Sequence, residues 1–166
     1  MRKVLLIEPG TKVSTFPPLG LLHLATAIKK DYEVYIKDYS GKKIDEGEIT
    51  AMIKKIDPFV VGLRVLTGPD IPRAIEISKI AKRLNKPVIW GGPHPTILPE
   101  QTLLNENIDA VCIGEGEYTL LDLLEYFKGK KETVLGAGVK KDGKIKIFKP
   151  QKKFVDLRYI LSVAKH

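Results

Sequence analysis

Short apolar runs recur along this chain, and each is bounded by polar or turn-forming residues. Brief, near-continuous apolar runs are typical of strands that are buried on both faces of a sheet. The sequence therefore predicts strands at residues 4–7, 33–37, 59–63, 87–90 and 110–113.

The segments between these runs have helical spacing. Within residues 44–56, for example, Ile49, Met52, Ile53 and Ile56 recur at intervals of three and four, which places them on one face of a helix. Helices are predicted at residues 19–30, 44–56, 71–84, 98–105 and 118–127.

Strands that alternate with helices indicate an α/β fold with a parallel sheet covered on both faces. The pattern fits a flavodoxin/Rossmann-like, doubly wound, five-stranded sheet of strand order 2-1-3-4-5. Farther along, residues 134–140 and 144–148 flank Asp142-Gly143, a pair suited to a tight turn, and predict a C-terminal β-hairpin. The expected divisions are an α/β domain at 1–130, a hairpin extension at 131–150, and a tail or the start of a linker to an absent domain at 151–166.

Composition adds limits to this picture. The chain has 166 residues, of which 43% are hydrophobic and 29% charged, as expected for one globular domain. The single cysteine, Cys112, rules out an internal disulfide and fits a cytoplasmic location. No apolar run approaches the ~20 residues of a membrane span, so no membrane partner is expected.

The net charge of +8 raises the question of a nucleic-acid partner. Most lysines are spread along the chain, which favours a solvated basic face. A local cluster occurs only around the hairpin, at Lys140, Lys141, Lys144, Lys146, Lys149, Lys152 and Lys153. A basic hairpin that binds RNA or DNA is therefore kept as an alternative.

In an open parallel sheet, ligands bind beyond the carboxyl ends of the strands. The loop after the first predicted strand is stiffened by Pro17, and Gly20 lets the next helix begin close to a ligand. The loop after the third strand begins at Arg64, whose guanidinium must meet a carboxylate, a phosphate or an exposed edge. In the same loop, Thr67 offers a hydroxyl, and Asp70 is interpreted as a helix N-cap.

The other two loops are rich in glycine. Gly91 and Gly92 directly follow the fourth strand and indicate a close backbone approach, which suits a flat, bulky ligand over the sheet edge. His94 lies between two prolines and is either a ligand contact or a structural hydrogen-bonding group. The sequence G-E-G-E at residues 114–117 opens the last helix, and its acids argue against a phosphate cradle.

Several kinds of chemistry are excluded. Neither a G-x-x-x-x-G-K-[ST] phosphate loop nor a G-x-S-x-G elbow is present, and G-x-G-x-x-G does not follow the first strand. One cysteine cannot hold a cysteine-ligated iron–sulfur cluster within this chain. His23, His94 and His166 lack metal-ligand spacing, so no metal-ligating or catalytic residue is assigned.

Four motifs together resemble the N-terminal domain of cobalamin-dependent radical-SAM enzymes. They are P-P-L-G-L-L at residues 17–22, T-G-P at 67–69, G-G-P-H-P-T at 91–96 and G-E-G-E at 114–117. The resemblance implies a cobalamin whose corrin face lies against the loops after strands one, three, four and five, with its nucleotide tail at the sheet edge. It places the cofactor against Pro17, Leu19, Gly20, Arg64, Leu66, Thr67, Gly68, Gly91, Gly92, Pro93, His94, Gly114, Glu115, Gly116 and Glu117.

Two departures from the wider corrinoid-binding pattern matter. No D-x-H-x-x-G motif follows the first strand, so a base-off cobalamin without a protein histidine from that loop is expected. Where Ser-x-Leu is common after the third strand, this chain has Arg64-Val65-Leu66. Arg64 then either lies under the corrin and disfavours a lower axial ligand, or signals altered binding.

Members of the resembled family continue into a barrel with a C-x-x-x-C-x-x-C cluster motif, which this chain does not contain. We therefore expect a non-catalytic cobalamin-binding domain that serves methyl transfer or radical chemistry together with a radical-SAM barrel domain or subunit. The alternatives are a cofactor-free docking module, a flavodoxin-like enzyme for nucleotides or other small molecules, and the basic hairpin that binds nucleic acid.

Overall fold

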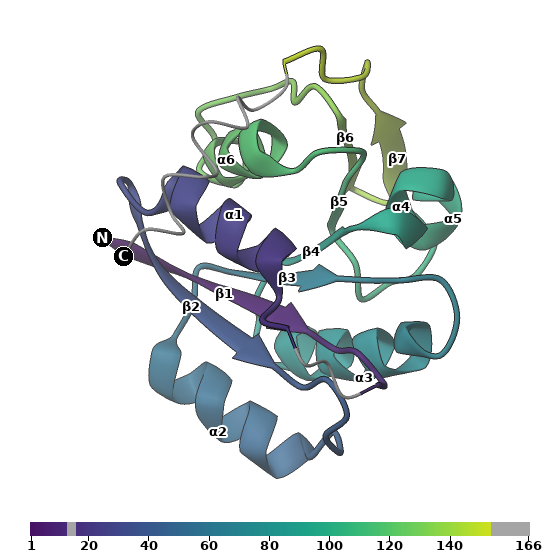
Figure 1. Ribbon diagram of the computed structural model, residues 1–166. Coiled ribbons are helices and arrows are strands. Elements are labelled where there is room, and N and C mark those ends of the chain that lie inside the picture. Colours follow the sequence, from purple (N-terminus) through teal and green to yellow (C-terminus); the bar gives the residue numbers. More distant parts are fainter. Residues whose placement is uncertain (13–15, 154–166) are drawn as a thin grey trace.

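The computed structural model describes residues 1–12 and 16–153. All described strands form one sheet of order β2-β1-β3-β4-β5-β6-β7 (Figure 1). The first five strands are parallel neighbours, which confirms the predicted order: β1 Arg2–Glu8, β2 Tyr32–Asp38, β3 Val60–Arg64, β4 Val88–Gly91 and β5 Ala110–Cys112. The predicted hairpin, β6 Ala137–Lys141 and β7 Lys144–Ile147, pairs antiparallel with β5 and widens the same sheet.

Six helices connect the strands within the described residues. The four longer ones are α1 Leu19–Ile28, α2 Glu46–Ile56, α3 Asp70–Arg83 and α6 Glu117–Phe127. The helix expected at residues 98–105 is present as α5 Pro99–Leu103, and a further short helix, α4 Pro93–Ile97, lies where the sequence analysis expected only a loop. Leu98 between them has φ −127° and ψ 57°. The ring of Pro99 disfavours helical backbone at the residue before it, so a continuous helix cannot pass through Leu98.

Helices cover the sheet on both faces (Figure 1). Alternate strand residues point to opposite sides, so Leu6 and Ile89 pack toward α1 and α6, whereas Leu5 and Trp90 pack toward α2 and α3. The Trp90 indole donates to the Ser78 hydroxyl at 2.9 Å, so its polar atom is satisfied inside the core. Burial on both faces explains why the strands read as continuous apolar runs.

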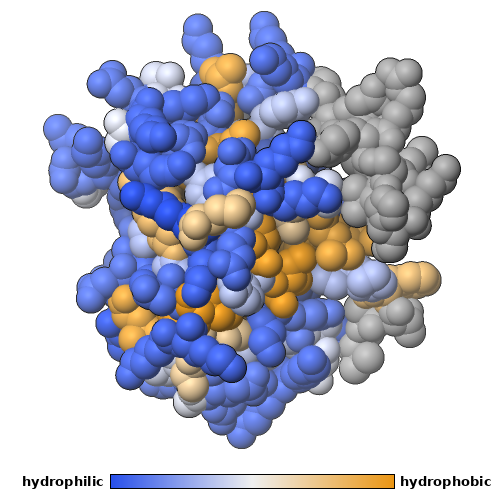
Figure 2. All heavy atoms as spheres, turned by 90° about the vertical axis from the view of Figure 1, so that its left-hand side faces the viewer, coloured by the Kyte–Doolittle hydropathy of each residue, from blue (hydrophilic) through white to orange (hydrophobic). Residues whose placement is uncertain are grey.

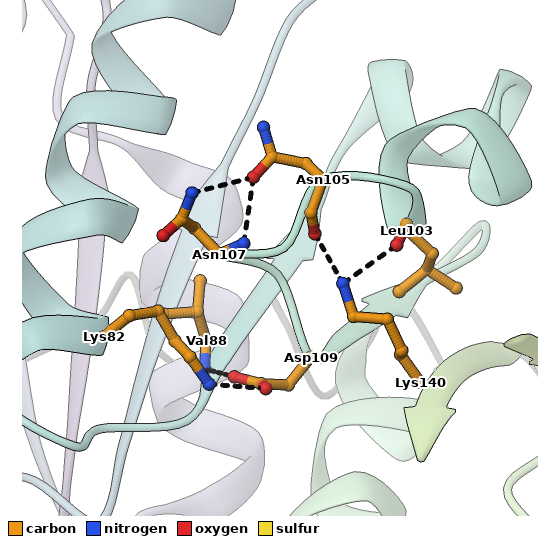
Figure 3. Close-up of polar contacts among 7 residues, drawn as sticks. All are labelled: Lys82, Val88, Leu103, Asn105, Asn107, Asp109 and Lys140. Carbon is orange, nitrogen blue, oxygen red and sulfur yellow. Dashed lines mark hydrogen bonds and ion pairs between the residues drawn. The ribbon is translucent and has the colours of Figure 1, made fainter. Parts of the chain in front are cut away.

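At the amino end of β4 and β5, Asp109 and Lys140 hold the strands in place (Figure 3). The Asp109 carboxylate accepts a hydrogen bond from the Val88 amide at 2.7 Å and pairs with Lys82 at 2.6 Å. The Lys140 ammonium donates to backbone carbonyls at the end of α5 and just beyond it. Burial lowers the pKa of Lys140. Lys140 therefore has a structural role and does not belong to the exposed basic cluster expected on the hairpin.

The open edges of the sheet are β2 at one end and β7 at the other. Figure 2 views the molecule from the side where β2 lies and shows an apolar band between polar regions. Val34, Tyr35 and Ile36 of β2 are only partly buried.

None of the helices in the described part is long and apolar enough to span a bilayer. The expected tail at 151–166 falls mostly outside the described residues.

Candidate functional site

The carboxyl ends of β1, β3, β4 and β5 meet the starts of α1, α3, α4 and α6 at one edge of the sheet (Figure 1). None of these four helix starts has a side-chain hydrogen bond at its N-cap. The amides of a first helical turn lack partners within the helix. The starts of α1, α3 and α6 therefore offer backbone donors to a bound molecule, as expected at the topological switch point of the fold. The start of α4 does not, because Pro93 and Pro95 have no N–H and the His94 amide is bonded to the Val65 carbonyl.

A cavity of about 160 Å³ opens at this edge, between the sheet and helices α1 and α6. It exists because strand and helix positions that point into it carry glycine. We call it the glycine-lined cavity, and its defining residues are Gly20, Gly62, Gly91, Gly116, Cys112 and Glu117.

The glycines of this cavity serve different ends. A Cβ on Gly62 would lie 2.9 Å from Leu6 Cδ2, and one on Gly116 would lie 2.9 Å from Leu24 Cδ2, so a side chain at either position would make a leucine side chain shift. A Cβ on Gly91 would meet only Cys112 Cβ, at an ordinary 3.6 Å. Neither packing nor a positive φ requires glycine at residue 91, and the absence of a side chain there keeps this part of the cavity open.

Gly92 is required by its backbone. Its φ of 96° and ψ of −171° belong to a region that is essentially restricted to glycine. A Cβ there would also lie 3.1 Å from the Val65 carbonyl oxygen. That oxygen accepts the His94 amide at 3.1 Å, so the turn at Gly92 joins the β4 loop to the β3 loop. The close backbone approach at Gly92 is therefore to the β3 loop of the protein itself, and the approach of a ligand to this loop stays a prediction.

Thr96 joins the two glycine-rich loops. Its hydroxyl donates to the Gly92 carbonyl at 2.8 Å and accepts from the Gly114 amide at 3.0 Å. The sequence motif contains this threonine, but no role could be assigned to it before its partners were known. The hydroxyl fixes the rim of the cavity across β4 and β5.

Arg64 meets a carboxylate, which is the first of the three environments expected for it. Its guanidinium lies 3.0 Å from Glu8, whose side chain is 7% exposed, while that of Arg64 is 36% exposed. Burial raises the pKa of Glu8, and the charge and hydrogen bond of Arg64 oppose that rise. Arg64 lines both the glycine-lined cavity and the neighbouring groove, so the ion pair sits where the two meet.

Removing this arginine is expected to make stability depend on pH. The fold already favours protonated Glu8. Its contribution to the free energy of unfolding is therefore greatest below pH 4.5 and is lost as the pH rises through the pKa that Glu8 has in the folded state. In Arg64→Met that pKa rises further, and an unpaired buried carboxylate costs roughly 1–3 kcal/mol. Urea unfolding should therefore show a larger loss of stability at pH 7 than at pH 5.

The double variant Glu8→Gln with Arg64→Met is the control for this experiment. The glutamine amide introduced by Glu8→Gln carries no charge, so the extra loss between pH 5 and pH 7 should disappear. Equal destabilisation of Arg64→Met at both pH values would show that Arg64 acts only through packing.

A groove of about 550 Å³ adjoins the cavity and lies among the loops after β1, β2 and β3. We call it the loop groove, and its lining includes Pro17, Leu19, Gly20, Arg64, Leu66 and Thr67. Asp70 anchors its wall by accepting the Thr11 amide at 3.0 Å and the Thr11 hydroxyl at 3.2 Å. The expected N-cap role of Asp70 was wrong, because Pro69 is the N-cap and Asp70 is the first helical residue.

The cavity and the groove together collect most of the expected site residues. Gly114, Glu115, Gly116 and Glu117 line the cavity with Gly91 and Gly92. The expected residues that line neither space are Gly68, Pro93 and His94.

His94 is built into the loop structure. It is 8% exposed, its Nδ1 lies 3.3 Å from the Thr67 hydroxyl, and its ring meets the edge of Trp90. These contacts match the structural alternative that the sequence left open for this histidine.

Cys112 lies within the glycine-lined cavity. Burial, with a smaller effect of the Glu117 charge, raises the pKa of its thiol from 9.0 to about 12. A thiol held this far from ionisation is a poor nucleophile.

No group of three or more His, Cys, Asp or Glu side chains suited to a metal ion occurs among residues 1–12 and 16–153.

Comparison with protein families decides what kind of domain carries this site. The family model of the B12 binding domain matches residues 9–124. The chain belongs to the B12-binding domain family. The matched range of this B12-binding domain includes the loops after β1, β3, β4 and β5, so the family relationship covers the site except for β1 residues such as Glu8.

Relatives in sequence are methyltransferases. An uncharacterized methyltransferase of Pyrococcus horikoshii is 36% identical over 156 residues, covering 87% of this chain and 34% of the relative. The cytidylyl-2-hydroxyethylphosphonate methyltransferase of Streptomyces wedmorensis is 28% identical over 179 residues, covering 90% of this chain and 33% of the relative. The chain thus spans about a third of the length of these relatives.

Solved structures show the same fold. The radical S-adenosylmethionine methyltransferase TsrM from Kitasatospora setae has a TM-score of 0.78 at 22% identity, covering 92% of this chain and 31% of TsrM. The cobalamin-dependent S-adenosylmethionine radical enzyme OxsB, bound to aqua-cobalamin, has a TM-score of 0.73 at 20% identity, covering 92% of this chain and 23% of OxsB. The B12-binding family that the four sequence motifs indicated is confirmed, and the chain shares its fold with these two radical S-adenosylmethionine enzymes.

Proposed function

We propose that this B12-binding domain holds one cobalamin base-off, with the nucleotide tail in the glycine-lined cavity and the corrin ring over the rim of the cavity and the loop groove. We further propose that it presents the cobalt to a radical-SAM domain or subunit for methyl transfer. The observation that carries the binding mode is the open space in front of Gly91. No close contact with a neighbouring protein atom accounts for the glycine at this position.

The size and apolar lining of the glycine-lined cavity support the entry of a flat ring such as the lower base of a cobalamin. Apolar cavities of about 150 Å³ bind a benzene ring, and this one has about 160 Å³ and an opening at the sheet edge. A flat heterocyclic base suits such a slot. The ribose and phosphate that follow it would continue toward the exposed loop around Gly114 and Glu115.

The rim around the loop groove suits a macrocycle. Leu19 is 56% exposed and Leu66 is 38% exposed, so apolar side chains stand open beside the cavity mouth. Burying apolar surface of this kind stabilises a complex by roughly 25 cal/mol per Å². Pro17 stiffens the loop that carries Leu19, which reduces the entropy lost when a ligand binds.

The base-off state is supported by what the β1 loop lacks and by what Arg64 offers. Residues 9–18 contain no histidine that could ligate cobalt. Arg64, fixed by Glu8, lies at the junction of cavity and groove, and a guanidinium remains charged and is not a metal ligand. Arg64 therefore disfavours a lower axial ligand beneath the ring. A cobalamin complex of Arg64→Met with an unchanged affinity and visible spectrum would contradict this role.

The role in methyl transfer rests on the relatives, which are three times as long as this chain and are named methyltransferases. When bound, cobalamin supplies a cobalt centre that can accept and donate a methyl group. This chain contributes the binding loops, the largely apolar cavity, and the Glu8–Arg64 pair at the mouth.

The first experiment is to mix the full chain with hydroxocobalamin, remove free ligand by gel filtration and record the visible spectrum. We expect about one equivalent of retained corrin with a base-off band shape. Colour lost on the column would contradict the proposed binding and favour a cofactor-free docking module. A base-on or histidine-ligated spectrum would contradict the base-off state alone.

Cys112 supplies a second readout that does not depend on colour. Because its pKa is about 12 where 9.0 is ordinary, the thiolate fraction at pH 8 is lowered about a thousandfold. Labelling by a small neutral thiol reagent should therefore be slow and should rise about tenfold per pH unit. Cobalamin in the cavity should slow it further, whereas unchanged labelling of the cobalamin complex would place the tail elsewhere.

A further inference from the structure

Glu117 holds an oxygen that lacks a partner. Its Oε2 atom is buried and, among the described residues, no hydrogen-bond donor reaches it. Glu117 begins α6 and lines the glycine-lined cavity. Its charge contributes to the raised pKa of the Cys112 thiol, which places the carboxyl group close to the cavity wall formed by β5.

The surroundings of Glu117 explain why this oxygen is costly. Leu24, Leu120 and Cys112 line the same cavity, and Arg64, the cationic residue in its lining, is already paired with Glu8. A buried polar atom without a partner destabilises a fold, and the cost is higher for a charged group. Such groups are rare in native structures and indicate a missing partner.

The neighbouring acid behaves differently. Glu115 belongs to the same loop and also lines the cavity, but its side chain is exposed, so water satisfies its carboxylate. The contrast separates a carboxylate that needs a partner inside the cavity from one that does not. It also supplies a matched control, because both residues carry the same charge in one short segment.

We propose that Glu117 is a specificity-determining residue that accepts a hydrogen bond from an N–H or O–H group on the nucleotide tail of the corrinoid. The domain then distinguishes complete cobamides from cobinamide, which has the corrin amides but no nucleotide. This inference rests on the proposed function, since it requires the tail to enter the glycine-lined cavity. The donor is either a ribose hydroxyl or an amino group on the lower base.

The test compares Glu117→Met, Glu117→Gln and the control Glu115→Met with the unaltered chain. Each is titrated with hydroxocobalamin, with adeninylcobamide, whose base carries an amino group, and with cobinamide. A hydrogen bond to a charged group corresponds to roughly a ten- to hundredfold change in affinity. We expect Glu117→Met to weaken binding of at least one complete cobamide by that factor, and Glu117→Gln to weaken it less.

The three ligands separate the possible outcomes. Equal weakening of both complete cobamides identifies a ribose hydroxyl as the donor, and selective weakening of adeninylcobamide identifies the base amino group. Cobinamide affinity should stay unchanged. Equal weakening of cobinamide, or no weakening at all, overturns the inference while leaving cobalamin binding intact. Failure of the unaltered chain to bind any corrinoid overturns the proposed function instead.

Stability without ligand gives an independent readout. If Oε2 awaits a ligand donor, Glu117→Met should leave the ligand-free domain as stable as before, or more stable, while it weakens cobamide binding. A structural role would produce the reverse pattern, with a lower urea midpoint and an unaltered ratio of cobalamin to cobinamide affinity. Glu115→Met should change neither quantity by more than about twofold.

Discussion

Replacing Gly92 by alanine is expected to destabilise the domain by roughly 3 kcal/mol. The backbone at φ 96° and ψ −171° costs a residue with a side chain about 1–3 kcal/mol. The new methyl group would also lie 3.1 Å from the Val65 carbonyl oxygen and 3.2 Å from Arg64 Cγ, so the β3 loop must shift. Chemical unfolding followed by circular dichroism measures the loss.

Gly68→Ala is the matched control for this prediction. Gly68 has a φ of 114°, but no heavy atom lies within 4 Å of the position a Cβ would take. It therefore reports backbone strain without the close contact, and we expect about 1–2 kcal/mol. A Gly92→Ala variant no less stable than Gly68→Ala would show that the β3 and β4 loops yield easily, and that the rim of the cavity is not rigid.

Filling the space in front of Gly91 should weaken cobalamin binding and leave the stability of the domain almost unchanged. Gly91→Ala places a methyl group 3.6 Å from Cys112 Cβ, an ordinary contact, so stability should change by less than about 1 kcal/mol. The same methyl group takes space from the glycine-lined cavity. We expect roughly tenfold weaker cobalamin binding for Gly91→Ala and a loss of about a hundredfold or more for Gly91→Leu.

Cobinamide is the control ligand here, because it has no nucleotide tail to place in the cavity. Its affinity for Gly91→Ala should match that for the unaltered chain. Titration followed by absorbance, together with an unfolding curve for each variant, separates loss of binding from loss of folding. Undiminished cobalamin binding by a folded Gly91→Leu variant would place the tail outside this cavity.

Local patterns were enough to predict the fold. Strands buried on both faces must be apolar along their length, so five apolar runs located the parallel strands, and their order followed from the doubly wound fold that alternating strands and helices indicate. The short helix α4 was missed, because its five residues, two of them proline, give no helical spacing of apolar positions. Pairing of β6 with β5 depends on contacts that no local pattern reveals.

The site divides in the same way. Loop glycines were found because their backbone role is local, and Gly62 could have been found, since a lone glycine inside a strand indicates a close approach. Glu8 was missed because its partner, Arg64, lies 56 positions away. No sequence motif could predict that Glu117 Oε2 lacks a partner. This property depends on the absence of a hydrogen-bond donor among all the described residues around it in the folded structure.

The antiparallel pairing of β6 with β5 has a consequence for how the chain folds during synthesis. Val134, Ala137 and Val139 belong to the same core as α6, and β6 occupies one edge of β5. Until the ribosome has released these residues, β5 presents an unpaired edge next to an incomplete apolar layer, and such edges promote aggregation. A nascent chain stalled after α6 should therefore depend on chaperones, whereas release of the hairpin should free it from them.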